Sequence, residues 1–254
     1  MGMTKLDAHN DIRPAGSAER NTGYPSPQPE PDNPADAQTF GLKPEQRFST
    51  QIWLRKITNA ATLNPQLLKD LAELEASNSS ITRSNVGGWH SDTNLHRLEA
   101  FKPLRQIIEN VSVGCANYLG LDFQKADLVF QGMWANRNGP GDYNTSHIHP
   151  NSFLSGSYYV KVPPESGNIE FNDPVGERCM FTYPVRPEVN YLPRRLAYRC
   201  SEGLLVMFPS WLPHGVQVNR SQESRMSIAF NIDCVPKPPG GIRHAPGAGK
   251  LQSG

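Results

Sequence analysis

The sequence predicts a mainly β fold, an antiparallel sandwich or barrel preceded by two supporting helices. From Asp127 onward, apolar and polar residues alternate with a period of two, which is typical of half-buried strands. Gly, Pro or Asn lies at most boundaries between the alternating segments. No helical pattern separates them, so the crossovers that join parallel strands are not expected. The predicted strands are 127–137, 145–149, 154–162, 167–172, 196–200, 203–208, 214–218 and 225–233.

Two helical patterns precede these strands. In residues 64–76 four leucines recur at helical spacing, and Asn64-Pro65 is expected to supply the cap and the first helical residue. A second apolar stripe predicts a helix from about residue 100 to 119, which Gly120 is expected to end.

Composition along the chain suggests one folded domain between two tails. Residues 1–45 are polar and rich in proline, so we expect a disordered or extended segment. Residues 46–235 form the predicted β domain, which opens with a strand-like run at 47–54. The Pro/Gly-rich residues 236–254 are expected to form a flexible tail.

Charge and cysteine usage exclude several classes of partner. With 25 basic and 24 acidic residues the net charge is +1, and no Lys/Arg cluster stands out. We therefore expect neither nucleic acid nor a membrane as partner. No apolar run approaches the ~20 residues that span a bilayer. The four cysteines are far apart, without a CxxC pair, which favours reduced thiols in a cytoplasmic protein.

Three histidines predict a metal site. His147 and His149 stand at i and i+2 on an extended segment, so their imidazoles project to the same side. His214, which is bracketed by apolar residues at a strand end, is the candidate third ligand. Imidazole binds iron and zinc alike, so these residue types alone leave the metal open. His90 and His96, in an expected loop at 77–99, have a weaker claim to a direct role.

Arg225 predicts an anion site beside the metal. In the strand that it opens, Arg225, Ser227 and Ala229 fall on one face, and Met226 and Ile228 fall on the apolar other face. A guanidinium near a metal pocket offers a bidentate dock for a carboxylate, to which the Ser227 hydroxyl could also donate. The ordinary alternative is a strand whose polar face meets solvent.

Five short motifs carry a family resemblance. They are Gly88-Trp89-His90-Ser91, His147-Ile148-His149-Pro150, Ser155-Gly156-Ser157-Tyr158-Tyr159-Val160, Phe208-Pro209-Ser210-Trp211-Leu212-Pro213-His214 and Arg225-Met226-Ser227-Ile228-Ala229-Phe230-Asn231. This set resembles the Fe(II)/2-oxoglutarate-dependent oxygenases, most closely a little-characterised, mainly bacterial branch, over about residues 48–233. The resemblance implies a jelly-roll, double-stranded β-helix that uses Fe(II), 2-oxoglutarate and O2. It also implies oxidation of a small molecule or of an amino-acid or peptide substrate, with release of succinate and CO2. Hydroxylation is the default outcome, and desaturation or cyclisation would use the same site.

The resemblance assigns roles residue by residue. His147 and His214 match the two histidine ligands, and Arg225 with Ser227 matches the dock for the far carboxylate of 2-oxoglutarate. Tyr159 falls where prolyl-hydroxylase-like members place a tyrosine on that carboxylate, and a core aromatic is the alternative. Asn136, at the end of a predicted strand, is a weaker addition to the same pocket.

One ligand position departs from the pattern. The superfamily has Asp where this chain has His149. We expect His149 to be a third neutral metal ligand, because imidazole is a competent iron ligand. The catalytic set is then His147, His149, His214 and Arg225. In the alternative, His149 stands aside and water fills the position.

Two other functions remain open from the sequence. A cupin-type metal dioxygenase needs no 2-oxoglutarate, and Gly203, Pro209 and His214 fit its second motif in part. Its first motif requires a Glu shortly after the histidine pair, and residues 150–154 contain none. A non-catalytic binding protein on the same barrel is the other possibility. The substrate is not legible, and a homodimer is left open.

Overall fold

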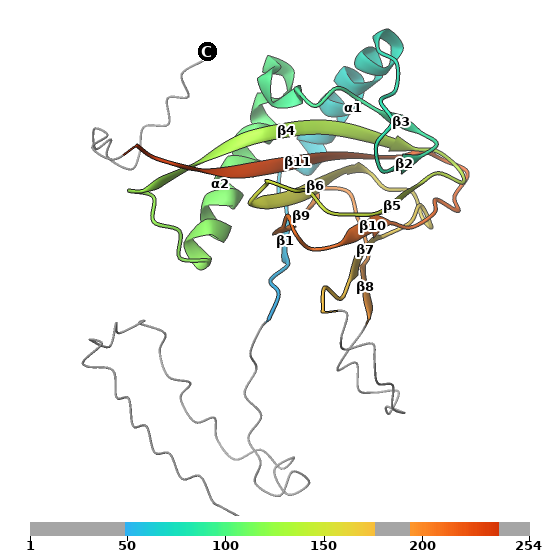
Figure 1. The fold of residues 1–254 in the computed structure, drawn as a ribbon. Coiled ribbons are helices and arrows are strands. Elements are labelled where there is room, and N and C mark those ends of the chain that lie inside the picture. Colours follow the sequence, from blue (N-terminus) through green and yellow to red (C-terminus); the bar gives the residue numbers. More distant parts are fainter. Residues whose placement is uncertain (1–48, 176–193, 239–254) are drawn as a thin grey trace, which may run out of the picture. The chain divides into compact units, whose positions relative to one another are not determined.

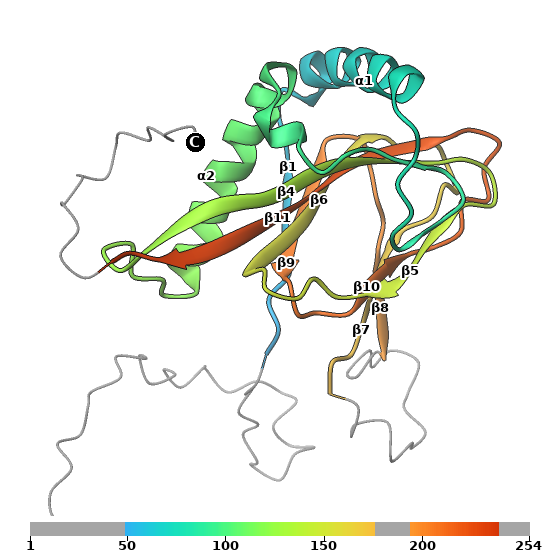
Figure 2. The same ribbon diagram turned by 45° about the horizontal axis from the view of Figure 1, so that its top comes forward.

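Two antiparallel sheets face each other, and helices cover the outer face of the larger sheet (Figures 1 and 2). This computed structural model describes residues 49–175 and 194–238. Its strands are β1 (Trp53–Lys56), β2 (Asn85–Val86), β3 (Trp89–His90), β4 (Ala126–Asn138), β5 (Tyr143–His147), β6 (Leu154–Lys161), β7 (Ile169–Asn172), β8 (Arg195–Tyr198), β9 (Leu204–Pro209), β10 (His214–Val216) and β11 (Arg225–Pro236). The α-helices are α1 (Ala60–Ser77) and α2 (Lys102–Tyr118), with 3-10 turns at Leu95–Arg97 and Glu99–Phe101.

The sheet order confirms the predicted fold class. The large sheet has six strands in the order β1-β9-β6-β11-β4-β3, and the small sheet has five in the order β2-β5-β10-β7-β8. All pairs between these strands are antiparallel. The eight predicted strands correspond to β4 through β11, with ends displaced by a few residues.

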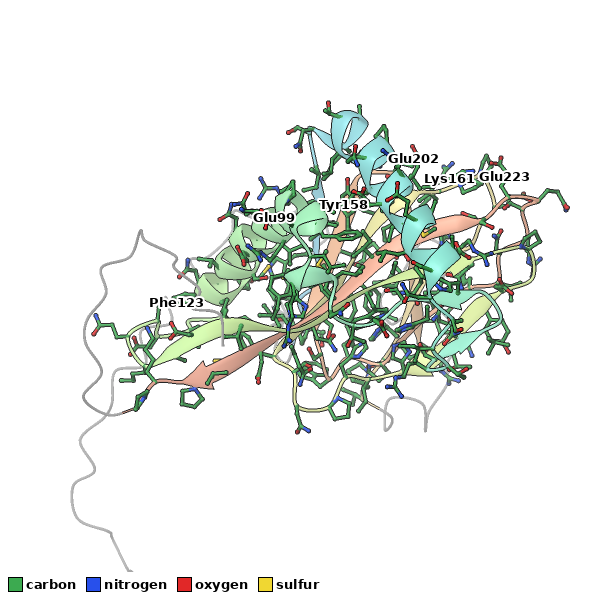
Figure 3. All side chains as sticks on the ribbon, turned by 90° about the horizontal axis from the view of Figure 1, so that it is seen from above. Glu99, Phe123, Tyr158, Lys161, Glu202 and Glu223 are labelled. Atoms are coloured by element: carbon green, nitrogen blue, oxygen red, sulfur yellow. The ribbon has the colours of Figure 1, made fainter. Side chains whose placement is uncertain are left out.

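The start of the first helix was predicted wrongly. Helix α1 begins at Ala60 instead of Asn64, so Pro65 lies inside the helix. Asn64 is buried and serves tertiary packing: its Nδ2 donates to Val160 O at 2.7 Å, and Tyr158 Oη donates to its Oδ1 at 2.6 Å. Figure 3 labels Tyr158, which lies on the large sheet under the helices. The cap-forming character of Asn-Pro was therefore misleading at this position.

The segments around the helices differ from the prediction in smaller ways. Of the run expected as a strand at 47–54, residues 47 and 48 lie outside the described residues, and β1 begins at Trp53, where its pairing with β9 starts. The expected loop at 77–99 contains β2, β3 and a 3-10 turn. Helix α2 ends at Tyr118, and Gly120 follows with a positive φ of 77°, as predicted.

Two apolar clusters lie on opposite faces of the large sheet. The cluster under the helices includes Leu67, Leu71, Leu104, Ile108, Ile228 and Phe230. The cluster between the two sheets includes Tyr159, Ile169, Phe171, Val206, Phe208 and Leu212. Strand β11 contributes Met226, Ile228 and Phe230 to the first cluster, so its alternate residues face the space between the sheets.

The predicted segment 1–45 and nearly all of the predicted tail 236–254 lie outside the described residues. The described residues all belong to one compact unit that starts at Ser49. Within them, neither α-helix has the length and apolar character needed to cross a membrane.

Asn64 gives a stability prediction. Replacing Asn64 with Ala leaves Val160 O and the Tyr158 hydroxyl buried without partners, so chemical denaturation should show a loss on the order of 2–4 kcal/mol. The control is Gln66→Ala on the same helix, where an exposed amide bonds only Asp70. It should change the unfolding free energy by less than about 0.5 kcal/mol. Equal stability of the two variants would contradict this role of Asn64.

Candidate metal centre

The structure brings the three predicted histidines together. His147 ends β5, His149 follows in the next loop, and His214 begins β10. Because β5 and β10 are paired, His214 lies directly opposite His147. One ring nitrogen from each imidazole lies within 4.8 Å of the other two. The ring centroids are 4.4 Å apart for His147–His214, 4.9 Å for His147–His149 and 5.1 Å for His149–His214.

Hydrogen bonds fix the orientation of two of these rings. His147 Nδ1 lies 2.8 Å from Thr145 O, and His214 Nδ1 lies 2.9 Å from Leu212 O. A carbonyl oxygen only accepts, so both Nδ1 atoms carry the proton and both Nε2 atoms keep their lone pair. A backbone carbonyl on the second ring nitrogen is the usual support of a metal-bound histidine. The donor set therefore fits a transition metal.

Burial keeps these imidazoles neutral. It is the main cause that lowers the pKa of all three, to about 4 for His149 and about 3 for His214. The neighbouring His147 lowers the pKa values of His149 and His214 further. Neutral imidazole is the form that binds a metal. Among the described residues, this group contains no carboxylate, so the protein ligands would bring no negative charge.

Arg225 lies buried between the sheets with part of its guanidinium already bonded. Nη1 donates to Ser166 O at 3.0 Å and to Gly167 O at 3.2 Å, and Nη2 donates to Asn138 Oδ1 at 2.7 Å. The side chain is only 1% exposed, and burial lowers its pKa, although a guanidinium stays protonated in proteins. Its Nε has no partner, and the described residues provide no carboxylate for it.

Three further predicted residues lie next to each other in the large sheet, one step along β11 from Arg225 on the same face. Ser227 on β11 lies opposite Tyr159 on β6 and opposite Asn136 on β4. All three are buried, and the Oδ1 atom of Asn136 has no partner. Burial raises the pKa of Tyr159 well above 10, so its phenol stays neutral and can donate. Tyr159 also packs in the apolar cluster between the sheets, so both uses considered for it agree with its position.

Trp134, which the sequence analysis did not single out, extends this site together with His90, which had a weaker claim to a direct role. Trp134 on β4 lies against His149, with ring centroids 5.8 Å apart. His90 stacks on the same indole, with ring centroids 5.8 Å apart and an interplanar angle of 12°. Period two along the predicted strand 127–137 places Trp134 on the same face as Asn136, which was the available signal. His90 and His96 both lie outside the metal-ligand group.

Comparison with known proteins supports one family. Residues 132–231 match a family model described as "Putative 2OG-Fe(II) oxygenase". That stretch contains the three histidines, Arg225, Ser227, Tyr159 and Asn136. A search of curated protein sequences finds no significant match.

Solved structures confirm the fold. A Pseudomonas putida prolyl-4-hydroxylase is 15% identical, with a TM-score of 0.51 over 73% of this chain and 94% of that chain. The non-heme α-ketoglutarate-dependent epimerase SnoN from nogalamycin biosynthesis is 14% identical, with a TM-score of 0.55 over 81% of this chain and 87% of that chain. The carbocyclase SnoK from the same biosynthesis is 12% identical, with a TM-score of 0.52 over 72% and 79%.

These likenesses identify the two-sheet architecture as a double-stranded β-helix, as predicted. The branch within the superfamily stays a prediction. The matched stretch spans the strands that carry the histidines and Arg225, and the fold agrees, so this part of the chain is similar to the Fe(II)/2-oxoglutarate-dependent oxygenases.

Proposed function

We propose that this oxygenase holds Fe(II) on His147, His149 and His214 and docks the far carboxylate of 2-oxoglutarate on Arg225. The observation that carries the proposal is the convergence of three neutral imidazoles in the same barrel as a buried guanidinium that lacks a carboxylate. The substrate is a small molecule, an amino acid or a peptide. It is hydroxylated, with release of succinate and CO2.

The metal ligands are supported by the hydrogen bonds of the free protein. Thr145 O and Leu212 O hold His147 and His214 as the tautomer whose Nε2 can bind a metal. His149 joins them from the loop after β5. Bound iron supplies the redox chemistry that couples oxidative decarboxylation of 2-oxoglutarate to oxidation of the substrate.

The co-substrate dock is supported by unpaired polar atoms. A buried cation without a counter-charge is costly, and a bound carboxylate would remove that cost. Arg225 Nε is the free donor, and the Ser227 hydroxyl and the Tyr159 phenol are neighbouring donors from β11 and β6. Asn136 faces the same space from β4 and would contact the co-substrate from that side.

The proposed range of substrates is based on the enzymes whose solved structures are similar to this chain. They are a prolyl-4-hydroxylase and two enzymes of nogalamycin biosynthesis. Peptide and small-molecule substrates are therefore both within reach of this barrel, and we propose neither nucleic acid nor a membrane as partner. We also propose that the protein acts in the cytoplasm, since Cys115, Cys200 and Cys234 are free thiols.

Arg225 provides the first functional prediction. Replacing Arg225 with Ala removes a charge-assisted contact in a buried pocket, which should weaken 2-oxoglutarate binding by about 2–5 kcal/mol. Anaerobic calorimetry with the metal-loaded protein measures this, while the affinity for Fe(II) alone should hardly change. The control is Arg225→Lys, which keeps the positive charge but loses the planar guanidinium. Its affinity for 2-oxoglutarate should lie between that of the wild type and that of Arg225→Ala. Unchanged 2-oxoglutarate binding in the Ala variant would favour a cupin-type reaction.

His149 provides the second functional prediction. With three neutral ligands the free protein should bind Fe(II) weakly and bind it more tightly once 2-oxoglutarate brings negative charge. As a direct ligand, His149→Ala should weaken Fe(II) as much as His147→Ala, whereas an outer position predicts only about a 10–100-fold loss. His149→Asp should tighten Fe(II), provided that the shorter side chain reaches the metal. Anaerobic Fe(II) titration of the four proteins measures this, and wild-type affinity in His149→Ala would remove His149 from the site.

A further inference from the structure

Three of the sequence motifs meet in a buried chain of hydrogen bonds beside the metal group. Ser155 comes from β6, Ser210 from the loop before β10, and Asn231 from β11. Ser155 Oγ lies 2.7 Å from Ser210 Oγ and 2.8 Å from Asn231 Oδ1. The two serines are 1% and 0% exposed, and Asn231 is 9% exposed. The roles assigned to the motifs so far do not use these three side chains.

The chain has a defined direction. A serine hydroxyl carries one proton, and Ser155 donates its proton to Asn231 Oδ1. Ser210 must therefore donate to Ser155 Oγ. The sequence of donors is Ser210, then Ser155, then the amide oxygen of Asn231. Each hydroxyl is thus committed to one partner, and the Asn231 amide has one orientation.

Ser210 connects this chain to two of the proposed metal ligands. Its carbonyl accepts the backbone N–H of His149 at 3.0 Å. Two residues later in the same loop, Leu212 O accepts the Nδ1 proton of His214 at 2.9 Å. The backbone N–H of Ser210 donates to Phe153 O at 3.2 Å. One loop therefore supports His149 and His214, and the Ser210 side chain fastens that loop to the large sheet.

We propose that Ser210, Ser155 and Asn231 are positioning residues that set the places of His149 and His214 before the metal binds. The inference rests on the proposed metal group, and none of the three side chains belongs to that group. Without the chain, the loop at Ser210 would keep its backbone bonds but lose its side-chain link to β6 and β11. Part of the binding free energy of the metal would then be spent on ordering the two histidines.

The test is an anaerobic titration of Fe(II) alone, without 2-oxoglutarate, into the full chain. Ser155→Ala removes both bonds of the chain and should weaken Fe(II) binding about 10–100-fold, the usual scale for groups that orient ligands. Ser210→Ala removes the first bond and should weaken Fe(II) binding less. The double variant should bind Fe(II) no more than about three-fold more weakly than Ser155→Ala, because both residues act through one chain.

The matched control is Ser112→Ala in α2. Ser112 is 1% exposed and its hydroxyl donates to Ile108 O at 2.8 Å, so this change also removes a hydrogen bond of a buried serine, away from the metal group. Because Ile108 O keeps its helical N–H partner, Ser112→Ala should change the melting temperature little and keep the wild-type Fe(II) affinity. Asn64→Ala, which should lower stability away from the metal group, should also keep that affinity. A loss of Fe(II) affinity in Ser155→Ala that Asn64→Ala does not share therefore reports positioning and not general stability.

The outcomes separate this inference from the proposed function. Wild-type Fe(II) affinity in both serine variants, with affinity lost in His147→Ala, overturns the positioning role alone. A wild-type protein that binds Fe(II) no better than His147→Ala overturns the metal centre and the positioning role together. If Ser155→Ala does not fold, the Fe(II) affinity of Ser210→Ala tests the positioning role, because that variant leaves the Ser155–Asn231 bond intact.

Discussion

The alternation of residues along β11 is the constraint on which the rest of the structure depends. This strand lies between β4 and β6 in the large sheet, so both of its edges are paired, and an apolar cluster lies on each face of the sheet. One face supplies Ile228 and Phe230 to the core under the helices. The other carries Arg225, Ser227 and Asn231 toward the small sheet. A shift of one residue in register would exchange these faces, burying a cation in the apolar core, so packing energy also fixes the place of the site.

Charge balance gives the site its second organising principle. The three imidazoles are held neutral by burial, and Arg225 is a buried cation without a carboxylate among the described residues. A divalent metal would add further positive charge that the protein ligands do not offset. In the proposed function the counter-charge comes from 2-oxoglutarate, which carries two carboxylates. In that proposal, His149 at the position where the similar oxygenases have Asp would leave the negative charge to the co-substrate.

The sequence predicted the parts of the structure that depend on local periodicity. The period-two pattern predicted β4 through β11, and the spacing of His147 and His149 predicted that their rings would converge with His214. The start of α1 was missed because Asn64 bonds Val160 and Tyr158, which lie 96 and 94 residues away in sequence. The bonds of Ser155 to Ser210 and Asn231 span 55 and 76 residues. Contacts of that range follow from the fold and leave no pattern in a single sequence.

The two ends of the barrel interior differ in how completely their polar atoms are paired. Seven buried side-chain atoms lack a hydrogen-bond partner among the described residues, and three of them are Arg225 Nε, Asn136 Oδ1 and Ser166 Oγ. The carbonyl of Ser166 accepts a hydrogen bond from the Arg225 guanidinium. At least two of these unpaired atoms, Arg225 Nε and Ser166 Oγ, therefore lie at the end of the interior that holds this guanidinium, the guanidinium end.

At the metal end, by contrast, Ser155, Ser210 and the oxygen of Asn231 are bonded to one another. Buried polar groups cost free energy when unpaired and specify a unique geometry when paired. The metal end is therefore built to keep one shape before any ligand binds. In the proposed function, the unpaired donor at the guanidinium end would meet the carboxylate of 2-oxoglutarate.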